Sequence, residues 1–267
     1  ASFGARLGRD EHVLAPAPGS LATTSRATGI APRIGLAVLT SATTRLHAAW
    51  SAGVRANPRC EACGDEPAPE TARSRQVELG WRQELRNGRF GWTATAYEVV
   101  DREAVVREAD AERAATWLPR RTSRGVELQA NGELRTDLRV VLSAAWTDAR
   151  VTDAGTSGWA DGARMPRVPF HAITAMAIQR VSEGAFAGLD LGFGVEYEGE
   201  RPADPSGTLM LPAATLASAM LGYGRDRWHV QVNAANLGDV RAFDADPSGA
   251  LWPREPRAVR GTLRWAF

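Results

Sequence analysis

The sequence predicts an all-β protein, an antiparallel β-barrel that spans a membrane, and three observations lead to this fold class. Segments of about ten residues alternate between apolar and polar side chains, and this is the length that a tilted strand needs to cross a bilayer. The connections between these segments alternate between short and long. Aromatic side chains gather near both ends of the segments, as they do at the two interfaces of a membrane.

The last segment, Pro256–Phe267, shows the pattern most clearly. Leu263, Trp265 and Phe267 fall on one face of an extended strand, whereas arginine and threonine side chains fall on the other. The outward face of a membrane barrel must be apolar and its rims are aromatic. This ending resembles the terminal strand of bacterial outer-membrane proteins, whose final Phe belongs to the signal that the barrel-assembly machinery reads. We therefore expect these three residues to serve as the assembly signal.

Counting such segments predicts twelve strands. They are Ser2–Val13, Ile30–Leu39, Thr44–Val54, Gln76–Leu85, Arg89–Arg107, Thr122–Leu134, Leu138–Thr152, Val168–Val181, Leu189–Glu200, Pro212–Gly224, Arg227–Leu237 and Pro256–Phe267. Because each predicted strand is followed by a turn or loop and then by its neighbour, we expect one meandering antiparallel sheet.

The connections support a membrane orientation. The short ones are Ser41–Thr43, Arg86–Gly88, Arg135–Asp137, Ser182–Gly188 and Arg225–Asp226, and Asn87–Gly88 within them is a strong hairpin signal. The long ones are Leu14–Gly29, Arg55–Arg75, Glu108–Arg121, Asp153–Arg167, Arg201–Leu211 and Gly238–Glu255. Bacterial barrels have short periplasmic turns and longer external loops, so we expect the long connections to face outward from the cell.

Composition excludes other classes. The 267 residues contain no run of about 18 apolar residues, so a helical membrane protein is excluded. The formal net charge of +1 gives no reason to expect a nucleic-acid partner. The four histidines lie on separate segments, without metal-ligand spacing, and His47 and His229 alternate with lipid-facing residues. No catalytic constellation is present, and we expect neither an enzyme nor a bound metal or cofactor.

Cys60 and Cys63 form the motif C-E-A-C in the long connection Arg55–Arg75. A pair of cysteines without a nearby histidine supplies half of a zinc site. An external loop faces an oxidising environment, in which disulfides persist. A local disulfide between the two cysteines is the favoured interpretation, and a role in ligand binding is the alternative.

Several short motifs resemble those of TonB-dependent siderophore receptors, in the order and spacing of that family. They are Pro32–Leu36 with Leu46–Ser51 (P-R-I-G-L and L-H-A-A-W-S), Val77–Gly80 (V-E-L-G), Arg124–Leu128 (R-G-V-E-L), Met165–His171 (M-P-R-V-P-F-H), Tyr197–Arg201 (Y-E-G-E-R) and Asn236–Asp239 (N-L-G-D). Together with the C-terminal Phe, they extend the resemblance from about Gly29 to Phe267.

The resemblance implies an energy-coupled importer in the outer membrane of Gram-negative bacteria, in which a barrel of about 22 strands surrounds a plug. Residues 1–267 would then be the C-terminal portion of the barrel domain, without the plug. The implied partners are a ferric siderophore as cargo, the TonB–ExbB–ExbD complex acting through the N-terminal part, the barrel-assembly machinery, and outer-membrane lipid with lipopolysaccharide.

Arginine and tryptophan in the long connections are the candidate ligand contacts. Ferric siderophores are often anionic, and arginine supplies charge and planar donors while tryptophan supplies a stacking face. The alternative is that these side chains are solvated or face lipopolysaccharide. The candidates are Arg113, Trp117, Arg120 and Arg121 in one loop, Trp159 and Arg164 in a second, and Trp252 in a third.

Two other outer-membrane functions fit parts of the pattern. An autotransporter translocator also has twelve strands and a C-terminal Phe, but it needs a helix that threads the pore, and residues 1–30 contain Pro16, Pro18, Gly19 and Gly29 and look like a strand with a loop. A structural or adhesive barrel without transport is the second alternative. The sequence upstream of Ala1 would separate the three functions.

Overall fold

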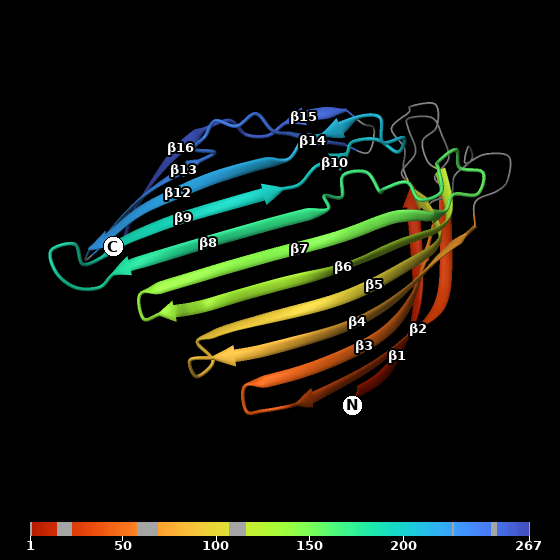
Figure 1. Ribbon diagram of the computed structural model, residues 1–267, viewed down its shortest axis with the longest axis horizontal. Helices are drawn as coiled ribbons and strands as arrows, with labels where there is room; N and C mark the ends of the chain where they lie inside the picture. Colours follow the sequence, from red (N-terminus) through yellow and green to blue (C-terminus); the bar gives the residue numbers. More distant parts are fainter. Residues whose placement is uncertain are drawn as a thin grey trace.

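The chain forms one strongly curved antiparallel sheet of twelve strands (Figure 1). The computed structural model describes residues 2–14, 23–57, 69–106, 116–225, 227–246 and 250–266. The twelve strands are β1 (Ser2–Leu14), β2 (Thr23–Leu39), β3 (Thr44–Ala56), β4 (Thr71–Leu85), β5 (Phe90–Val106), β6 (Thr116–Arg135), β7 (Leu138–Asp153), β8 (His171–Val181), β9 (Leu189–Glu198), β12 (Ala214–Arg225), β13 (Trp228–Ala235) and β16 (Ala258–Trp265).

Each strand of this sheet pairs with the next one along the chain, which confirms the predicted meander. Two long connections carry small two-stranded sheets of their own. β10 (Arg201–Pro202) pairs with β11 (Met210–Leu211), and β14 (Phe243–Ala245) pairs with β15 (Leu251–Pro253). Every strand pair in the described part of the chain is antiparallel, and this part holds no helix that is long and apolar enough to cross a membrane.

In the first half of the sheet, several strands extend further toward the long connections than the sequence pattern predicts, whereas β8, β9, β12, β13 and β16 stop two or three residues short of the predicted bounds at that end. β4 begins at Thr71 rather than Gln76, and β6 begins at Thr116 rather than Thr122. Backbone pairing continues there: Ala56 lies opposite Thr71, and Val106 lies opposite Thr116. Beyond the bilayer both faces of a strand are polar, so the alternation of side chains fades although the ladder of hydrogen bonds continues.

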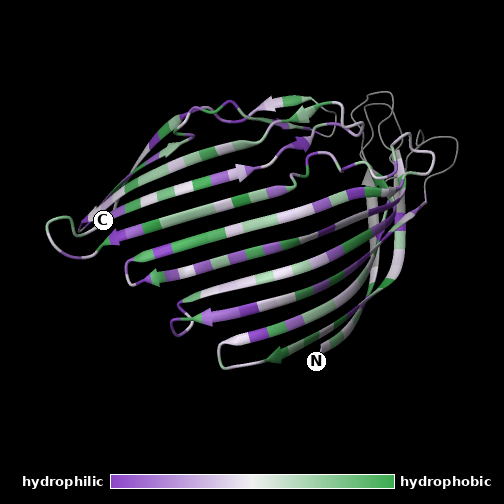
Figure 2. Ribbon diagram, in the orientation of Figure 1, coloured by the Kyte–Doolittle hydropathy of each residue, from purple (hydrophilic) through white to green (hydrophobic). Residues whose placement is uncertain are grey.

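Strand register separates the sheet into two faces. Residues directly opposite one another on neighbouring strands point to the same side. One such row runs through Leu36, Ala48, Leu79, Ala96 and Val126, all of them apolar. We call this side the apolar face, and the alternation along each strand is visible in Figure 2. Large apolar side chains on it are exposed, Leu79 by 62%, as a lipid-facing surface requires.

The opposite side, which we call the polar face, carries small and polar residues. His47 lies opposite Gly80, and its imidazole occupies the space where a Cβ at Gly80 would stand. In the same way Tyr97 reaches across Gly125 and its hydroxyl meets Thr147 Oγ1 at 3.1 Å. The glycines therefore make room for larger side chains of neighbouring strands. His47 and His229 both lie on this face, as the alternation predicts.

Aromatic side chains pair at the short-turn end of the apolar face. The rings of Trp81 and Trp92 are 5.5 Å apart, and those of Trp228 and Trp265 are 4.1 Å apart. Trp265 and Leu263 share the apolar face with Trp228, which confirms their predicted orientation. Phe267, the third residue of the expected assembly signal, lies outside the described residues.

β1 and β16 are the edges of the described sheet. An unpaired strand edge inside a bilayer leaves backbone groups without hydrogen bonds, at a cost of several kcal/mol for each group. The membrane-embedded protein therefore needs further strands, or direct pairing of β1 with β16, to close the wall.

Arginine should be tolerated on the polar face and rejected on the apolar face. Val232 lies on the apolar face, opposite Leu221 and Gly261, and its neighbour Gln231 lies on the polar face. An arginine near the middle of the lipid band costs about 2–4 kcal/mol. Val232→Arg should lower the yield of heat-modifiable, folded barrel in outer membranes, whereas Gln231→Arg should leave it near wild type. Equal yields would contradict the assignment of faces.

Candidate functional site

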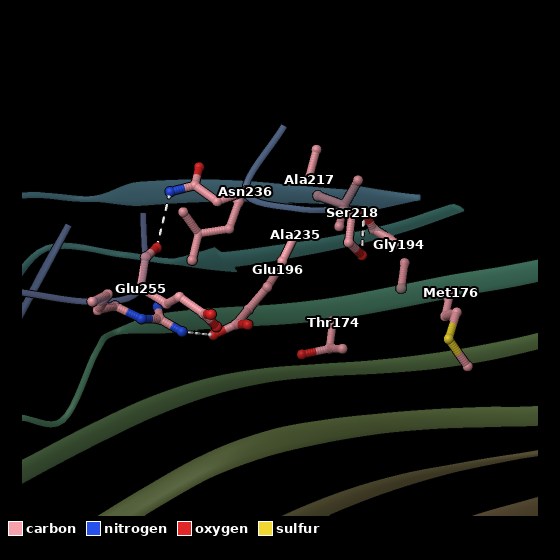
Figure 3. A pocket seen from close by; sticks show the side chains of 13 residues that line it. Thr174, Met176, Gly194, Glu196, Ala217, Ser218, Ala235, Asn236 and Glu255 are labelled. Carbon is pink, nitrogen blue, oxygen red and sulfur yellow. Dashed lines mark hydrogen bonds and ion pairs between the residues drawn. The ribbon is translucent and has the colours of Figure 1, made fainter. Parts of the chain in front are cut away.

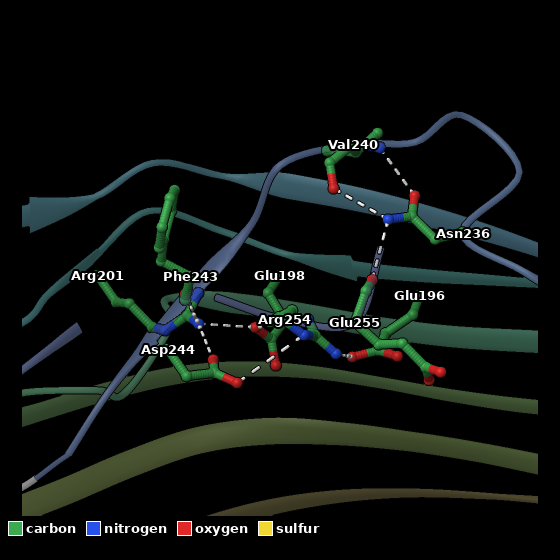
Figure 4. Close-up of polar contacts among 9 residues, drawn as sticks. All are labelled: Glu196, Glu198, Arg201, Asn236, Val240, Phe243, Asp244, Arg254 and Glu255. Carbon is green, nitrogen blue, oxygen red and sulfur yellow. Dashed lines mark hydrogen bonds and ion pairs between the residues drawn. The ribbon is translucent and has the colours of Figure 1, made fainter. Parts of the chain in front are cut away.

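Arg201 lies at the centre of an ion-pair network that joins two long connections to the sheet (Figure 4). Its side chain is only 5% exposed, the lowest value of any ion-paired arginine that the structure describes. Nη2 lies 2.9 Å from Glu198 Oε2 and 2.8 Å from Asp244 Oδ1. Glu198 ends β9, and Asp244 belongs to β14, so this one guanidinium connects the wall to the last long connection.

Arg254, just after β15, completes the network. Its Nη2 lies 2.5 Å from Glu196 Oε1, and Nη1 lies 3.4 Å from Glu198 Oε2. Burial disfavours the charged guanidinium, but the hydrogen bond to Glu196 and the negative charges of Glu196, Glu198 and Asp244 together outweigh that effect and raise the pKa of Arg254 above its ordinary value. The side chain is therefore charged throughout the physiological range, and it holds the β14–β15 hairpin over the polar face.

Asn236 holds the base of the same connection. Its Nδ2 donates to the carbonyl oxygens of Val240 at 3.0 Å and Glu255 at 3.2 Å, and its Oδ1 accepts the N–H of Val240 at 2.9 Å. The residue has a positive φ of 47°, which asparagine tolerates better than most residues. A turn of this kind closes the long connection where it leaves β13, and Arg254 ties its far end to the wall.

A pocket of about 310 Å³ lies beneath this connection (Figure 3). Its floor is the polar face of β8, β9 and β12, and Arg254 and Glu255 form one side. The lining residues are Thr174, Ala175, Met176, Gly194, Val195, Glu196, Leu216, Ala217, Ser218, Ala235, Asn236, Arg254 and Glu255. Glu196 and Arg254 form an ion pair with each other. Small apolar side chains and hydroxyl groups make up much of the remaining lining.

A second, smaller pocket of about 200 Å³ lies on the polar face of β5–β7. Arg121 forms one wall and donates from Nε and Nη2 to Asp101 Oδ2, at 2.9 and 2.7 Å. Met165 and Val168 of the β7–β8 connection also line this pocket. Behind it, Leu118 and Val151 are fully buried, with Trp159 and Met165 packed against them. The β7–β8 connection is thus anchored by an apolar cluster rather than by ions.

The sequence prediction placed Trp117, Arg120 and Arg121 in a loop, and this was wrong because all three lie on β6. Successive residues of a strand point to opposite sides. Arg121 shares the polar face with Asp101, so Arg120 points outward on the other face. The Trp117 indole N–H is buried, with no hydrogen-bond acceptor among the described residues. Of the two arginines, only Arg121 can line an entrance.

The other candidates have mixed placements. Trp159 and Arg164 lie in the β7–β8 connection, as predicted, but Arg164 pairs with Arg150 in a β-bridge and stacks over Phe170 at 5.1 Å, on the outward side. Trp252 lies on β15 and is 60% exposed. Arg113, Cys60 and Cys63 lie outside the described residues, so the disulfide stays a prediction. Whether any candidate contacts ligand also stays a prediction.

Sequence reasoning missed the network around Arg201. The motif Y-E-G-E-R, Tyr197–Arg201, contains both Glu198 and Arg201, but two residues lie between them and nothing in the pattern shows that they meet. Asp244 and Arg254 join them from about 45 residues or more further along the chain. The part of the chain that the structure describes contains no group of three or more His, Cys, Asp or Glu side chains that could hold a metal ion.

Comparison with known proteins gives a consistent result. Residues 3–237 match the family model of the TonB dependent receptor-like β-barrel. The chain is 30% identical over 236 residues to the metal-pseudopaline receptor CntO of Pseudomonas aeruginosa, covering 87% of this chain and 33% of that protein. It is 28% identical over 206 residues to the ferrioxamine B receptor of Salmonella typhimurium, covering 74% and 29%. The chain thus spans about a third of the length of these relatives.

Solved structures share the fold at lower identity. The siderophore receptor PiuA from Acinetobacter baumannii superposes with a TM-score of 0.78 at 18% identity, covering 98% of this chain and 40% of that one. The ferric-catecholate import receptor Fiu from Escherichia coli, in its closed form, gives a TM-score of 0.75 at 16% identity, covering 93% and 36%. At this identity the likeness concerns the fold, and it agrees with the twelve-stranded sheet.

Removing Arg201 should release the connections that it joins. Breaking a buried ion pair costs about 3–5 kcal/mol, and we expect less here because Asp244 is 57% exposed. In Arg201→Met, amide hydrogen exchange across residues 236–257 should accelerate at least about tenfold, which corresponds to roughly 1.4 kcal/mol. Arg135→Met, which changes an exposed arginine at a short turn, is the control. Unchanged exchange in Arg201→Met would show that the network does not hold the connection.

Proposed function

This chain belongs to the β-barrel family of TonB-dependent receptors, and from that premise we propose that it forms the C-terminal wall of an outer-membrane receptor that takes up ferric siderophores. The observation that carries the proposal is the match of residues 3–237 to the family model. This family consists of outer-membrane transport receptors rather than enzymes, so membership in it locates this protein in the outer membrane. Because the chain spans about a third of the length of these relatives, the activity of the whole protein is part of the proposal.

The proposed cargo is an iron–siderophore complex. Relatives and structural neighbours of the chain include receptors for ferrioxamine B and for metal-pseudopaline, and the siderophore receptor PiuA. The ligands in these receptors' names are metal chelates or the chelators that form them. A metal chelate of this general kind is consistent with a mouth that presents arginine and exposed tryptophan. The iron is cargo in this proposal and not a resident cofactor.

Capture at the long-connection end would use the polar face and its loops. Trp252 offers an exposed aromatic face on a hairpin that Arg201 and Arg254 hold over the wall. Arg121 is oriented by Asp101 at the edge of the smaller pocket. Anionic cargo would be attracted by arginine and stack on tryptophan, and the attraction should weaken with salt. Energy for release into the periplasm would come from the TonB–ExbB–ExbD complex, acting through parts of the receptor beyond residues 1–267.

The ion-pair network has a mechanical role in this proposal. A hairpin that carries a ligand-contacting side chain binds more tightly when it is held in place before the ligand arrives, because less conformational entropy is lost on binding. Arg201 and Arg254 each contact carboxylates of both β9 and β14. The network would therefore set the position of Trp252 relative to the wall.

Growth under iron limitation tests the function. A host that lacks the intact gene, supplied with a panel of purified ferric siderophores, should lose growth on one of them and regain it with the wild-type gene. Retained growth on every siderophore, combined with lost uptake of cobalamin or of a glycan, would reject the cargo and leave the barrel assignment intact. Loss of growth on another metal complex of the same chelator would extend the cargo class.

The contribution of Trp252 can be tested in the same host. Trp252→Ala should weaken binding of the growth-supporting siderophore by about fivefold, since a stacking contact at an exposed site is worth about 1 kcal/mol. Phe186→Ala is the matched control, because Phe186 is also highly exposed, at 70%, but lies at a short turn. Equal affinity of both variants, measured on purified intact receptor, would exclude a role for Trp252.

A further inference from the structure

We propose that a pocket at the short-turn end of the wall binds free carboxylates of the peptides of peptidoglycan, the cell-wall polymer of the periplasm. The pocket of about 300 Å³ lies between the β4–β5 and β6–β7 turns, at the end of the sheet opposite the long connections (Figure 1). Short turns of bacterial barrels face the periplasm. The inference goes beyond uptake and does not depend on the cargo. The lining residues are Arg86, Asn87, Arg89, Glu133, Arg135 and Thr136.

The backbone brings the two turns together. The N–H of Glu133 donates to the carbonyl oxygen of Arg89 at 2.8 Å, so the end of β6 is bonded to the residue that precedes β5. Gly132 has a φ of 128°, and a Cβ at this position would stand only 2.1 Å from the same carbonyl oxygen. Glycine is the residue that permits such an approach. The close spacing of the turns is therefore built into the chain, and side chains of both turns reach one cavity.

Two of the three arginines in this pocket have no carboxylate partner. Arg89 donates from Nε and Nη2 to Glu133 Oε2, at 2.8 and 2.5 Å, so these two charges neutralise each other. Neither the Arg86 nor the Arg135 side chain takes part in an ion pair or a hydrogen bond within the described residues. With three arginines against one carboxylate, the pocket carries an excess of positive charge, which favours an anionic ligand.

The acidic residues next to the pocket in sequence are engaged outside it. Asp137, in the β6–β7 turn, accepts a hydrogen bond from the hydroxyl of Ser182 in the following turn, at 2.5 Å. Glu84, near the end of β4, lies 3.2 Å from Nη2 of Arg82. Neither carboxylate belongs to the lining of the pocket. The excess positive charge is therefore left for a ligand.

Arg86 has a strained backbone conformation. Its φ is 54°, and Asn87 and Gly88 follow with 56° and 81°. A positive φ suits glycine and is tolerated by asparagine, but it is unfavourable for a long side chain such as arginine. Glycine or asparagine at position 86 would form the turn without this strain, so the turn itself does not require arginine. Strained residues are concentrated at binding sites, and what arginine adds here is a guanidinium in the wall of the pocket.

The lining favours a peptide carboxylate over other anions. A guanidinium binds a carboxylate through two parallel hydrogen bonds, and the Asn87 amide and Thr136 hydroxyl can bind peptide groups. A water molecule takes up about 30 Å³ in the liquid, so the pocket has room for more than one small anion. All six lining residues are polar, which gives an acyl chain no apolar wall. Peptidoglycan peptides combine free carboxylates with peptide groups on the side of the membrane that the short turns face.

Binding of a soluble disaccharide–tripeptide fragment of peptidoglycan to the purified intact receptor tests the proposal. The variant combines Arg86→Asn with Arg135→Gln, which removes both free guanidiniums and keeps a residue suited to a positive φ at position 86. The control combines Arg225→Gln with Arg227→Gln, two exposed arginines that flank the β12–β13 turn at the same end of the sheet. The fragment should bind the variant at least about tenfold more weakly than the wild type, because two charge-assisted contacts are lost. The control should bind like the wild type, and heat-modifiable electrophoretic mobility establishes that each protein is folded.

Three comparisons identify the ligand chemistry. Amidating the carboxylates of the fragment should weaken its binding to the wild type to the level of the variant, and raising the salt concentration should reduce the difference between the two proteins. Inorganic phosphate at the concentration of the fragment should not displace it. No binding to the intact wild-type receptor, unchanged affinity of the variant, an equal loss in the control, undiminished binding of the amidated fragment, or displacement by phosphate would each overturn the proposal. Siderophore affinity should remain the same in the variant, so failure here is distinct from failure of the proposed uptake function.

Discussion

The backbone's need for hydrogen bonds in a medium without water is the constraint on which this structure depends. Each residue in the bilayer carries a donor and an acceptor that lipid cannot satisfy, and pairing each strand with its sequence neighbour satisfies them with the shortest connections. The continuous ladder from β1 to β16 follows from that need. Once it exists, the side chains are divided into two sets with different solvents, and every further feature of the wall is a consequence of that division.

On the polar face, ion pairs attach the long connections to the strands. The network of Arg201 and Arg254 with Glu196, Glu198 and Asp244 shows how this is done: each guanidinium serves several carboxylates, and each connects the wall to a long connection. Ion pairs near a surface contribute little individually. Here Arg201 is buried and shares its carboxylate partners with Arg254. This arrangement fixes the position of the β14–β15 hairpin more than it adds to the stability of the sheet.

On the apolar face, the same logic acts at the boundary of the bilayer. Within the lipid band the outward positions of β4–β7 are mostly apolar. The next outward residue toward the long connections is charged on each strand: Arg75, Glu98, Arg124 and Asp148. Arginine is suited to that place because its long stem packs on apolar surface while its guanidinium reaches the headgroups. A loop-end arginine is therefore not a cargo contact by default. The side of the strand on which it stands decides whether it meets the lumen or the lipid, as Arg120 and Arg121 show.

The sequence by itself determined the strands, their order and their faces, because a period of two is a local property and a barrel repeats it at every hairpin. Leu263 and Trp265 on the apolar face, and the turn at Asn87–Gly88, follow from a few neighbouring residues. Tertiary structure decided where the strands end beyond the lipid, because both faces are polar there and the alternation of apolar and polar residues no longer marks a strand. It also decided the meeting of Arg201 with Asp244, because contacts between distant connections depend on the curvature of the whole sheet and leave no local signal.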